Sequence, residues 1–395
     1  MNEREALTVL IALDEKDQPL YAEQAQKRIR MNAGGTYYCP CCKGRVMFKS
    51  GEYMSAHFAH YHAENCAAFT EGETAAHLKG KRMLLEKFRV EGLPVLLESW
   101  LPELTQRPDL LIRPESGKPI AIEYQCSPIA FAELKGRTEG YRQNGYHVWW
   151  ICGMDYQPRH LTQKIFQFLN HSNEGGCWFS LLDSEREELQ LCHNFRISGT
   201  NQLTFDKAVF PLCGLPFPVL ERLFNKGEFP PAFYPKKKGR TAGGKRTYMQ
   251  PKDINLLRYR TDLEHKKFLL KIYLNREALH QLPALLFEYP FHSLSFITPI
   301  YIWGYYLLQE MISQGENASF TKQDVLKWIR QFLASKMIRK RETVFMKEEN
   351  DWASVLSFLK RLEGEQYLVA VGENQWLLLK LPEKGKTNCL FQNLQ

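Results

Sequence analysis

The sequence predicts an α/β protein whose chain divides into three parts, and three observations support this prediction. The chain has 395 residues, more than one compact core usually accommodates. Cysteines and histidines gather in the first 70 residues, helical and strand-like patterns alternate from about 71 to 155, and mainly helical patterns follow. We therefore expect domains at 1–70, 71–155 and 156–395, the last ending in a module at 319–380.

The composition limits the class of protein. Hydrophobic residues make up 44% and charged residues 24%, which is ordinary for a globular chain and excludes a disordered or membrane-embedded one. The net charge of +8 favours an anionic partner without specifying it. Met1–Lys16 lacks the basic start and long apolar stretch of a signal peptide, and Phe291–Leu308 reads as a buried helical segment. A cytoplasmic location is expected.

The N-terminal part follows a strand-like start with a tight cluster of cysteines and histidines. Cys39 and Cys42 form a C-x-x-C pair, and sulfur and imidazole ligands at such spacings suit tetrahedral Zn²⁺. The preferred ligand set is Cys39, Cys42, His60 and Cys66, with His57 as the alternate and His62 as a further one. Four protein ligands leave no open position, so this zinc would be structural. The competing interpretation is a group of reduced thiols with incidental histidines.

The central part has the predicted element order helix, three strands, helix, strand. Strong helix formers with apolar residues on one face span Glu71–Val90, and Gly92 and Pro94 end that helix. Three strand-like runs follow at Val95–Trp100, Leu110–Arg113 and Ile120–Gln125. A helix then opens at Pro128 and runs over 128–144, and a last strand spans His147–Cys152.

Acidic residues gather on the predicted hairpin. Glu123 and Gln125 are two apart on a strand and share a face, and Asp109 precedes the partner strand, so a hairpin would bring it beside Glu123. Carboxylate oxygens with a carbonyl of residue 124 or 125 suit Mg²⁺ or Mn²⁺, which could activate water against a phosphodiester. The competing interpretation is a solvated hairpin edge.

Two helices could complete this site. Glu73, His77 and Lys81 follow one another at four-residue spacing on the first helix, so their side chains form one stripe that could reach over the sheet. Arg137 and Tyr141 are also four apart, on the helix after the third strand. They could bind a scissile phosphate, or Arg137 could pair with a carboxylate.

The C-terminal part carries a basic loop at Phe233–Thr247 and a final pattern of two helices and a hairpin. The loop could track phosphates through Lys236, Lys237, Lys238 and Arg240, although a solvated linker has the same composition. Thr321 caps a predicted helix to Ser335, a second helix spans Trp352–Leu362, and strands follow at Gln366–Val371 and Gln375–Leu379. This order suggests a winged-helix-like module, which binds DNA or protein.

The residues resemble a known superfamily. Asp109 after Pro108, then Glu123-Tyr124-Gln125 inside this element order, is similar to the PD-(D/E)xK nucleases with their restriction-endonuclease-like core. More closely, residues 20 to 155 resemble the competence protein CoiA-like family, in the stretches YYCPCCKGRV, HFAH, EGETAAHLKGK, RPDLLI, AIEYQCSPIA and RTEGYRQNGYHVWWI. That family is associated with natural genetic transformation.

The resemblance implies roles for the central residues. Asp109 and Glu123 become ligands of catalytic Mg²⁺ or Mn²⁺, and Glu73 an additional acid. Gln125 stands where the superfamily has a lysine. Lys81, Lys135 or Arg137 could supply the missing charge and contact DNA.

The implied function is a metal-dependent DNA nuclease or DNA-processing protein of competence and recombination. Its partners would be DNA, single-stranded or branched, and recombination proteins. The alternative is a non-catalytic accessory that holds single-stranded DNA with its zinc unit, basic loop and C-terminal module. A zinc-bearing transcription factor would leave Glu73, Asp109 and Glu123 unexplained.

Overall fold

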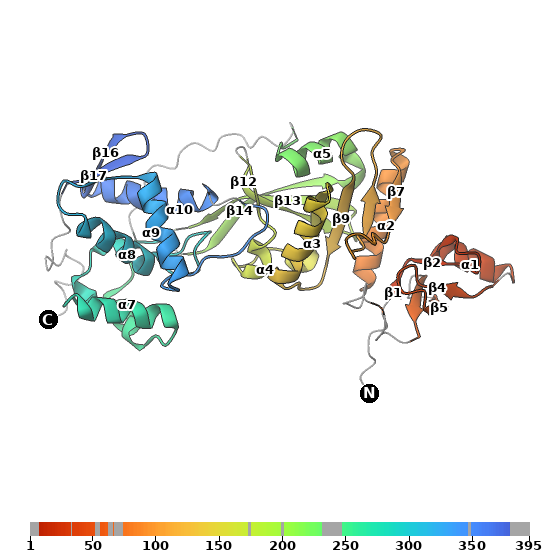
Figure 1. The fold of residues 1–395 in the computed structure, drawn as a ribbon, viewed down its shortest axis with the longest axis horizontal. Coiled ribbons are helices and arrows are strands. Elements are labelled where there is room, and N and C mark those ends of the chain that lie inside the picture. The colour runs from red at the N-terminus through yellow and green to blue at the C-terminus, as the bar shows by residue number, and fades with distance from the viewer. Residues whose placement is uncertain are drawn as a thin grey trace. The chain divides into compact units, whose positions relative to one another are not determined.

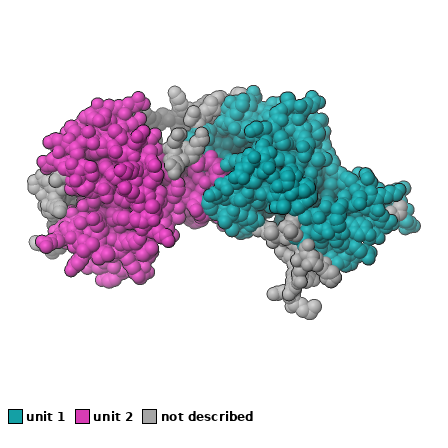
Figure 2. All heavy atoms as spheres, viewed as in Figure 1, with its two compact units in different colours: residues 1–158, 168–193, 206–234 teal, residues 159–167, 194–205, 235–395 magenta. Residues whose placement is uncertain are grey.

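The computed structural model describes residues 8–32, 34–51, 56–61, 66, 74–172, 175–198, 201–230, 247–346 and 349–379. Glu73, His62 and the basic residues Lys236, Lys237, Lys238 and Arg240 lie outside these ranges. The chain forms two compact units, coloured in Figure 2. Unit 1 comprises residues 1–158, 168–193 and 206–234, and unit 2 comprises 159–167, 194–205 and 235–395.

The N-terminal part of unit 1 is a six-stranded sheet with one helix (Figure 1). Its strand order is β1-β6-β5-β4-β2-β3, and every recorded pair is antiparallel. The elements are β1 (Thr8–Val9), β2 (Ile11–Leu13), β3 (Pro19–Tyr21), α1 (Ala22–Arg30), β4 (Tyr37–Tyr38), β5 (Arg45–Lys49) and β6 (His57–His60). A small core of its own, with Phe58 and Val46 fully or nearly fully buried, holds this sheet together.

The predicted order helix, three strands, helix, strand is confirmed in the central region. The elements are α2 (Ala75–Val90), β7 (Val95–Leu97), β8 (Leu110–Ile112), β9 (Ile120–Gln125), α3 (Phe131–Gln143) and β10 (His147–Gly153). Strand β7 ends three residues before the predicted end, because Glu98 takes the left-handed φ of +48°. Helix α3 begins at Phe131 rather than Pro128, because Ala130 is still extended.

Helices cover both faces of this sheet. Ile122 and Tyr124 of β9 share a core with Leu78 and Leu84 of α2, whereas Ala121 packs with Tyr141 of α3. Helices α2 and α3 therefore lie on opposite faces (Figure 1). Since β9 is buried on both sides, its run IAIEYQ is mostly apolar, with Glu123 and Gln125 as its polar exceptions.

The expectation of a mainly helical chain from about residue 156 is wrong for residues 170–211. Four strands lie there, β11 (Asn170–Ser172), β12 (Gly176–Asp183), β13 (Glu188–Ile197) and β14 (Leu203–Pro211). They extend the central sheet to the order β14-β13-β12-β10-β9-β8-β7, with β11 beside β12, and β10 runs parallel to both β9 and β12. The physical reason is burial: β12 is almost wholly covered, so its sequence lacks the alternation that distinguishes a strand from a buried helix.

Helix α5 (Phe217–Lys226) closes the α2 side of the sheet. The Phe217 ring meets Phe88 of α2 edge-on at 6.2 Å. Lys87 donates to the Leu215 carbonyl oxygen at 2.6 Å and to Glu91 at 2.6 Å, and Glu91 accepts from the Phe217 amide at 2.6 Å. Lys87 of α2 and Glu91, the residue directly after this helix, thus fix the start of a helix more than 120 residues later.

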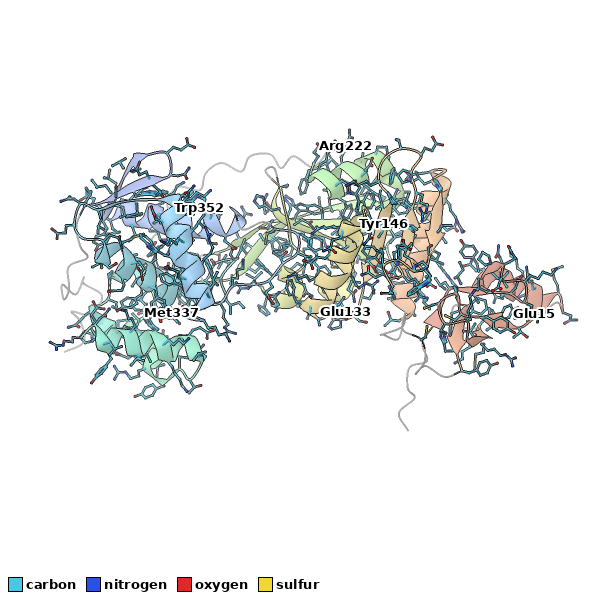
Figure 3. All side chains as sticks on the ribbon, viewed as in Figure 1. Glu15, Glu133, Tyr146, Arg222, Met337 and Trp352 are labelled. Atoms are coloured by element: carbon cyan, nitrogen blue, oxygen red, sulfur yellow. The ribbon has the colours of Figure 1, made fainter. Side chains whose placement is uncertain are left out.

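Unit 2 confirms the helical C-terminal region. It holds α4 (Gln163–Phe166), α6 (Pro251–Leu256), α7 (Leu263–Leu274), α8 (Ile300–Ser313), β15 (Ser319–Thr321), α9 (Lys322–Ala334), α10 (Glu349–Gly364), β16 (Leu368–Gly372) and β17 (Gln375–Leu378). Thr321 caps α9 as predicted, since its Oγ1 accepts from the Asp324 amide. The three strands pair in the order β15-β17-β16. Trp352, labelled in Figure 3, projects from α10 into the unit's core and lies 5.8 Å from the Trp376 ring.

Candidate active site

Helix α2 comes unusually close to strand β9, and a glycine allows it. A Cβ atom at Gly80 would overlap the ring of Tyr124. The helix begins where Thr74 Oγ1 accepts from the His77 amide at 3.2 Å. His77 and Lys81, one turn apart and on either side of Gly80, are thereby brought to Asp109 at the start of β8.

Asp109 lies immediately before β8, opposite Glu123. The β8–β9 register pairs Leu110 with Ile122, and continuing it one step sets Asp109 against Glu123. Asp109 Oδ2 accepts from the Tyr124 amide at 2.8 Å and lies 3.3 Å from His77 Nε2, and Oδ1 lies 3.5 Å from Lys81 Nζ. Burial opposes its ionisation, but the charges of His77 and Lys81 outweigh it and hold the pKa of Asp109 well below its usual range.

Glu123 points to the α3 side of β9. Arg137 Nη2 and the Tyr141 hydroxyl both donate to Glu123 Oε1, at 2.5 and 2.6 Å. Burial, helped by the charge of Asp109, raises the pKa of Glu123 although Arg137 opposes the shift. The pKa values of Asp109 and Glu123 therefore shift in opposite directions.

A third acid, Glu98, was not predicted. Its carboxylate is 1% exposed and forms ion pairs with Lys81 and with Arg107, whose Nη1 lies 3.6 Å from Oε2. Burial disfavours the charged form, yet Lys81 and Arg107 together lower the pKa of Glu98. The available signal was a single acid inside the apolar run VLLESW, which in a buried strand end requires a cationic partner.

The remaining predicted residues of this site are Gln125 and the three cations Lys81, Lys135 and Arg137. Gln125 follows Glu123 by two residues on the same strand, and its Nε2 donates to the Ser127 carbonyl oxygen at 2.8 Å, which uses one of its two N–H donors. Lys135 is half-exposed and lies 3.8 Å from Glu139 on its own helix, apart from the acidic residues. Of the three cations proposed to replace the motif lysine, Lys81 and Arg137 contact the acids.

This site offers the oxygen donors that hard divalent cations prefer, although among the described residues only Cys39, Cys42, His60 and Cys66 bring three or more ligand atoms together. Asp109 and Glu123 offer carboxylate oxygens, and His77 adds a nitrogen. Within the described part of the chain, Glu123 Oε2 accepts no hydrogen bond, because Arg137 and Tyr141 both use Oε1. The two donors thus hold the Glu123 side chain through a single carboxylate oxygen.

The second candidate site lies in the N-terminal sheet. Cys39, Cys42, His60 and Cys66, the preferred set, bring their ligand atoms within 4.8 Å of one another. Cys39 and Cys66 Sγ are 3.8 Å apart, and Cys42 Sγ lies 3.5 Å from His60 Nε2. Burial raises the pKa of the Cys39 thiol to about 12, and a bound cation would oppose this shift by stabilising the thiolate. The group could bind a metal such as zinc.

The alternate ligand His57 is not part of this group. It lies on β6 with His60, and residues three apart on a strand point to opposite faces. His60 shares its face with Phe58, and the register pairs it with Val46 of β5, the strand that follows the cysteine turn. Strand periodicity thus decides which histidine joins the cysteines.

The sheet flanked by helices, with two acids on adjacent strands and cations around them, defines a protein with a nuclease-like α/β domain. The family description "Competence protein CoiA, nuclease-like domain" matches residues 73–224. The CoiA N-terminal domain matches 20–69, and the CoiA C-terminal domain matches 246–390. The chain belongs to the competence protein CoiA family.

One relative is a curated protein. The chain is 35% identical to "Competence protein CoiA" of Bacillus subtilis (strain 168) over 159 residues. This alignment covers 39% of the chain and 41% of that relative, so it spans less than half of either. No solved structure matches the chain. Among the helices of the described residues, none has the length and apolar character needed to cross a membrane.

Proposed function

We propose that the chain is a metal-dependent deoxyribonuclease with a PD-(D/E)xK-type site, in which Asp109 and Glu123 bind Mg²⁺ or Mn²⁺. One observation carries the proposal: Lys81 Nζ lies 3.5 Å from Asp109 although Gln125 occupies the position of the motif lysine. The positive charge that such a site needs therefore comes from helix α2, which brings Lys81 to the same carboxylate.

A bound Mg²⁺ or Mn²⁺ would polarise the phosphodiester and lower the pKa of a water molecule. Asp109 stays ionised down to low pH, as a permanent ligand must. Arg137 and Tyr141 fix one oxygen of Glu123 and leave the other for the ion. Lys81 offsets negative charge developing on the phosphate, and the Gln125 amide oxygen can accept a hydrogen bond from the attacking water.

The Cys39, Cys42, His60 and Cys66 group is proposed to hold structural Zn²⁺. Three sulfurs and one imidazole complete a tetrahedral shell, so no position remains for substrate. The limit near residue 70 and a winged-helix-like module at 319–380 are kept as proposals, while the central domain is proposed to run beyond 155 because β11 to β14 extend its sheet. The winged-helix-like module is supported by the element order α8, β15, α9, α10, β16, β17 and by β17 as the central strand of its sheet.

The DNA substrate is proposed to be single-stranded or branched, handled in the cytoplasm during transformation together with recombination proteins. The name of the Bacillus subtilis relative supports the link to competence. The alternative, a non-catalytic accessory that holds single-stranded DNA, is favoured by one observation. Glu98, Asp109 and Glu123 are each paired with a cation, so the charges at the site already balance.

A cleavage assay separates the two functions. The full chain is incubated with single-stranded, double-stranded and branched DNA in Mg²⁺ or Mn²⁺, beside Asp109→Asn and Glu123→Gln, which preserve shape. We expect each substitution to lower kcat by roughly 10²- to 10³-fold. Cleavage that survives both substitutions contradicts the site. Tight DNA binding without cleavage in every metal supports the accessory function.

Two lysine variants test the source of the charge. Lys81→Ala should lower cleavage by roughly 10²-fold, whereas the matched control Lys135→Ala, from an exposed position on α3, should retain wild-type activity. Gln125→Lys should add little, because Lys81 already serves Asp109. A large gain from Gln125→Lys would show that Lys81 does not replace the motif lysine.

A further inference from the structure

Glu98 is buried at a place where its backbone and its charge both cost free energy. It takes a φ of +48°, a conformation that non-glycine residues rarely adopt, and only 2% of the residue is exposed. A buried carboxylate is tolerated only when it is well paired. The surrounding contacts must therefore compensate for both costs.

The first set of contacts ties Glu98 to Asp109 and Lys81. The Glu98 amide donates to the Asp109 carbonyl oxygen at 2.9 Å, which continues the β7–β8 ladder beyond Leu97. Lys81, with no exposed surface, contacts the carboxylates of both Glu98 and Asp109. Because a lysine side chain is flexible, a second anion that holds its ammonium group fixes where that group lies relative to Asp109.

The second contact comes from the N-terminal sheet. The Leu10 amide donates to Glu98 Oε2 at 3.2 Å and lies 3.4 Å from Oε1. Leu10 connects β1 to β2, and its buried side chain belongs to the hydrophobic core that includes Leu78 and Val95 of the nuclease-like domain. The N-terminal sheet thus supplies both a hydrogen bond and a core side chain to the neighbouring domain.

A continuous path joins this amide to the metal-binding group. Strand β1 pairs with β6, with Val9 opposite Phe58 and Thr8 opposite Ala59, and β6 ends at His60. A metal bound by His60 and the three cysteines would order β6, and β6 pairs with β1, which leads directly into Leu10.

We propose that Glu98 is a positioning residue that holds Lys81 against Asp109 and, through the Leu10 amide, makes this arrangement depend on the N-terminal metal-binding unit. The inference rests on the proposed function only in assigning Lys81 to the nuclease site. It gives the N-terminal unit a role in completing the site.

The chain contains a matched control for Glu98. Glu91 also accepts from a lysine of α2 and from a distant backbone amide, through Lys87 and Phe217, but it makes no recorded contact with Asp109 or Lys81. Glu98→Gln and Glu91→Gln therefore each remove a carboxylate that pairs with a lysine of α2 and accepts from a distant amide. Only the first should affect the site.

The decisive measurement is the reactivity of Lys81 toward acetic anhydride, quantified by mass spectrometry relative to Lys87 in the same full-length protein. Reactivity of a buried lysine reports local opening. Glu98→Gln should raise the Lys81 to Lys87 ratio by roughly ten-fold, and Glu91→Gln should lower it. An unchanged ratio in Glu98→Gln overturns the proposal, whether or not the protein cleaves DNA.

The link to the N-terminal unit has its own variants. Leu10→Pro removes the amide donor, whereas Leu10→Ala keeps it and loses only side-chain packing. Leu10→Pro should raise the Lys81 to Lys87 reactivity ratio above that of Leu10→Ala. Removal of the bound metal from the wild type by a chelator should do the same. Metal removal should cause no further rise in Glu98→Gln. Equal ratios in the two Leu10 variants would refute the link.

Cleavage provides a second readout. If the wild type cleaves DNA, Glu98→Gln should lower kcat by roughly 10- to 100-fold with little change in KM, as loss of positioning does. A wild type without cleavage contradicts the proposed function, and the labelling ratios then still decide the role of Glu98. Unfolding midpoints of all variants identify any that fail to fold.

Discussion

At the scale of single residues, Gly80 determines how far α2 can approach the sheet. It lies between His77 and Lys81 in sequence, and its missing side chain leaves the space that the Tyr124 ring fills. The amide of that same Tyr124 holds Asp109. A change in helix spacing at Gly80 would therefore alter the distance from both helix side chains to Asp109.

Gly80→Ala should destabilise unit 1 by about 1–3 kcal/mol through overpacking and should weaken cleavage. Gly136→Ala on α3 is the matched control, because a Cβ there meets no atom within 4 Å, and it should stabilise by about 0.5–1 kcal/mol. Hydrogen exchange of the β9 amides measures both effects. Equal protection in the two variants would contradict the close approach.

Tyr141 is one of two donors that keep a buried carboxylate in place. Tyr141→Phe leaves Glu123 with Arg137 alone, so it should cost about 1.5–3 kcal/mol at neutral pH and raise the pKa of Glu123 further. The loss should shrink at low pH, where protonated Glu123 no longer needs the donor. Tyr146→Phe, whose hydroxyl donates to the exposed Glu103, should cost less. Unfolding by urea at two pH values measures these differences.

The positions of the site residues could be predicted from the sequence where the repeat of a single strand determines which way their side chains point. The two-residue spacing of strands set Glu123 and Gln125 on one face, and the register then set Asp109 opposite Glu123. The contacts of Glu98 could not be predicted in this way. Its partners Leu10, Lys81 and Arg107 come from separate elements, and only the packed fold brings them together.

At the scale of elements, the N-terminal sheet combines short strands with the Cys39, Cys42, His60 and Cys66 group, which could bind a metal. Strand β4 has two residues and β6 has four, which is little for a stable sheet without further support. The cysteine turn joins β4 to β5, while β6 carries His60. A bound metal therefore cross-links the strands that need it most.

We expect one zinc per chain, and its removal should abolish hydrogen-exchange protection in β4, β5 and β6 while α8 of unit 2 stays protected. Cys42→Ala should lose the metal. Cys41→Ala should keep the metal, because Cys41 is adjacent to Cys42 in the sequence but is outside the ligand group. Metal analysis of the purified variants checks this, and a metal-free Cys41→Ala protein would contradict the ligand set.

Elements with one exposed face were easier to predict than wholly buried ones. Helix α9 shows both a cap at Thr321 and a buried stripe of Val325 and Trp328, and its limits were predicted within one residue. Strand β12 shows neither signal, since its run WFSLLD is buried throughout. A helix and a covered strand cannot be separated there by hydrophobic period alone.

At the scale of the whole molecule, each unit has a hydrophobic core of its own. The largest core cluster runs from Met249 to Leu378 in unit 2, and a second fills the α2 side of the sheet in unit 1. A single free energy of unfolding therefore does not describe this chain, and stability is best followed at amides of one unit.

Acid should weaken unit 2 through His292. Burial, with the charges of Arg341 and Arg260, lowers the pKa of His292 to about 4. The unfolded state accepts this proton near pH 6.5, so stability is complete above that value and is lost as the pH falls to about 4. We expect a loss of about 1–2 kcal/mol after allowing for partial exposure. Hydrogen exchange of the α8 amides should show this loss of stability at low pH, and His292→Phe should abolish the loss. An unchanged pH dependence in that variant would assign the loss to other groups.

The contact between α2 and the start of α5 has a consequence for synthesis of the chain. Lys87 emerges from the ribosome 128 residues before Leu215, whose carbonyl oxygen it binds. At about 5–20 residues per second, roughly 6–25 s pass before that partner is made. During this interval the Phe88 side chain lacks the Phe217 ring that later covers it. The nascent nuclease-like domain is thus a candidate for protection by a ribosome-associated chaperone, and release from it should follow translation of α5.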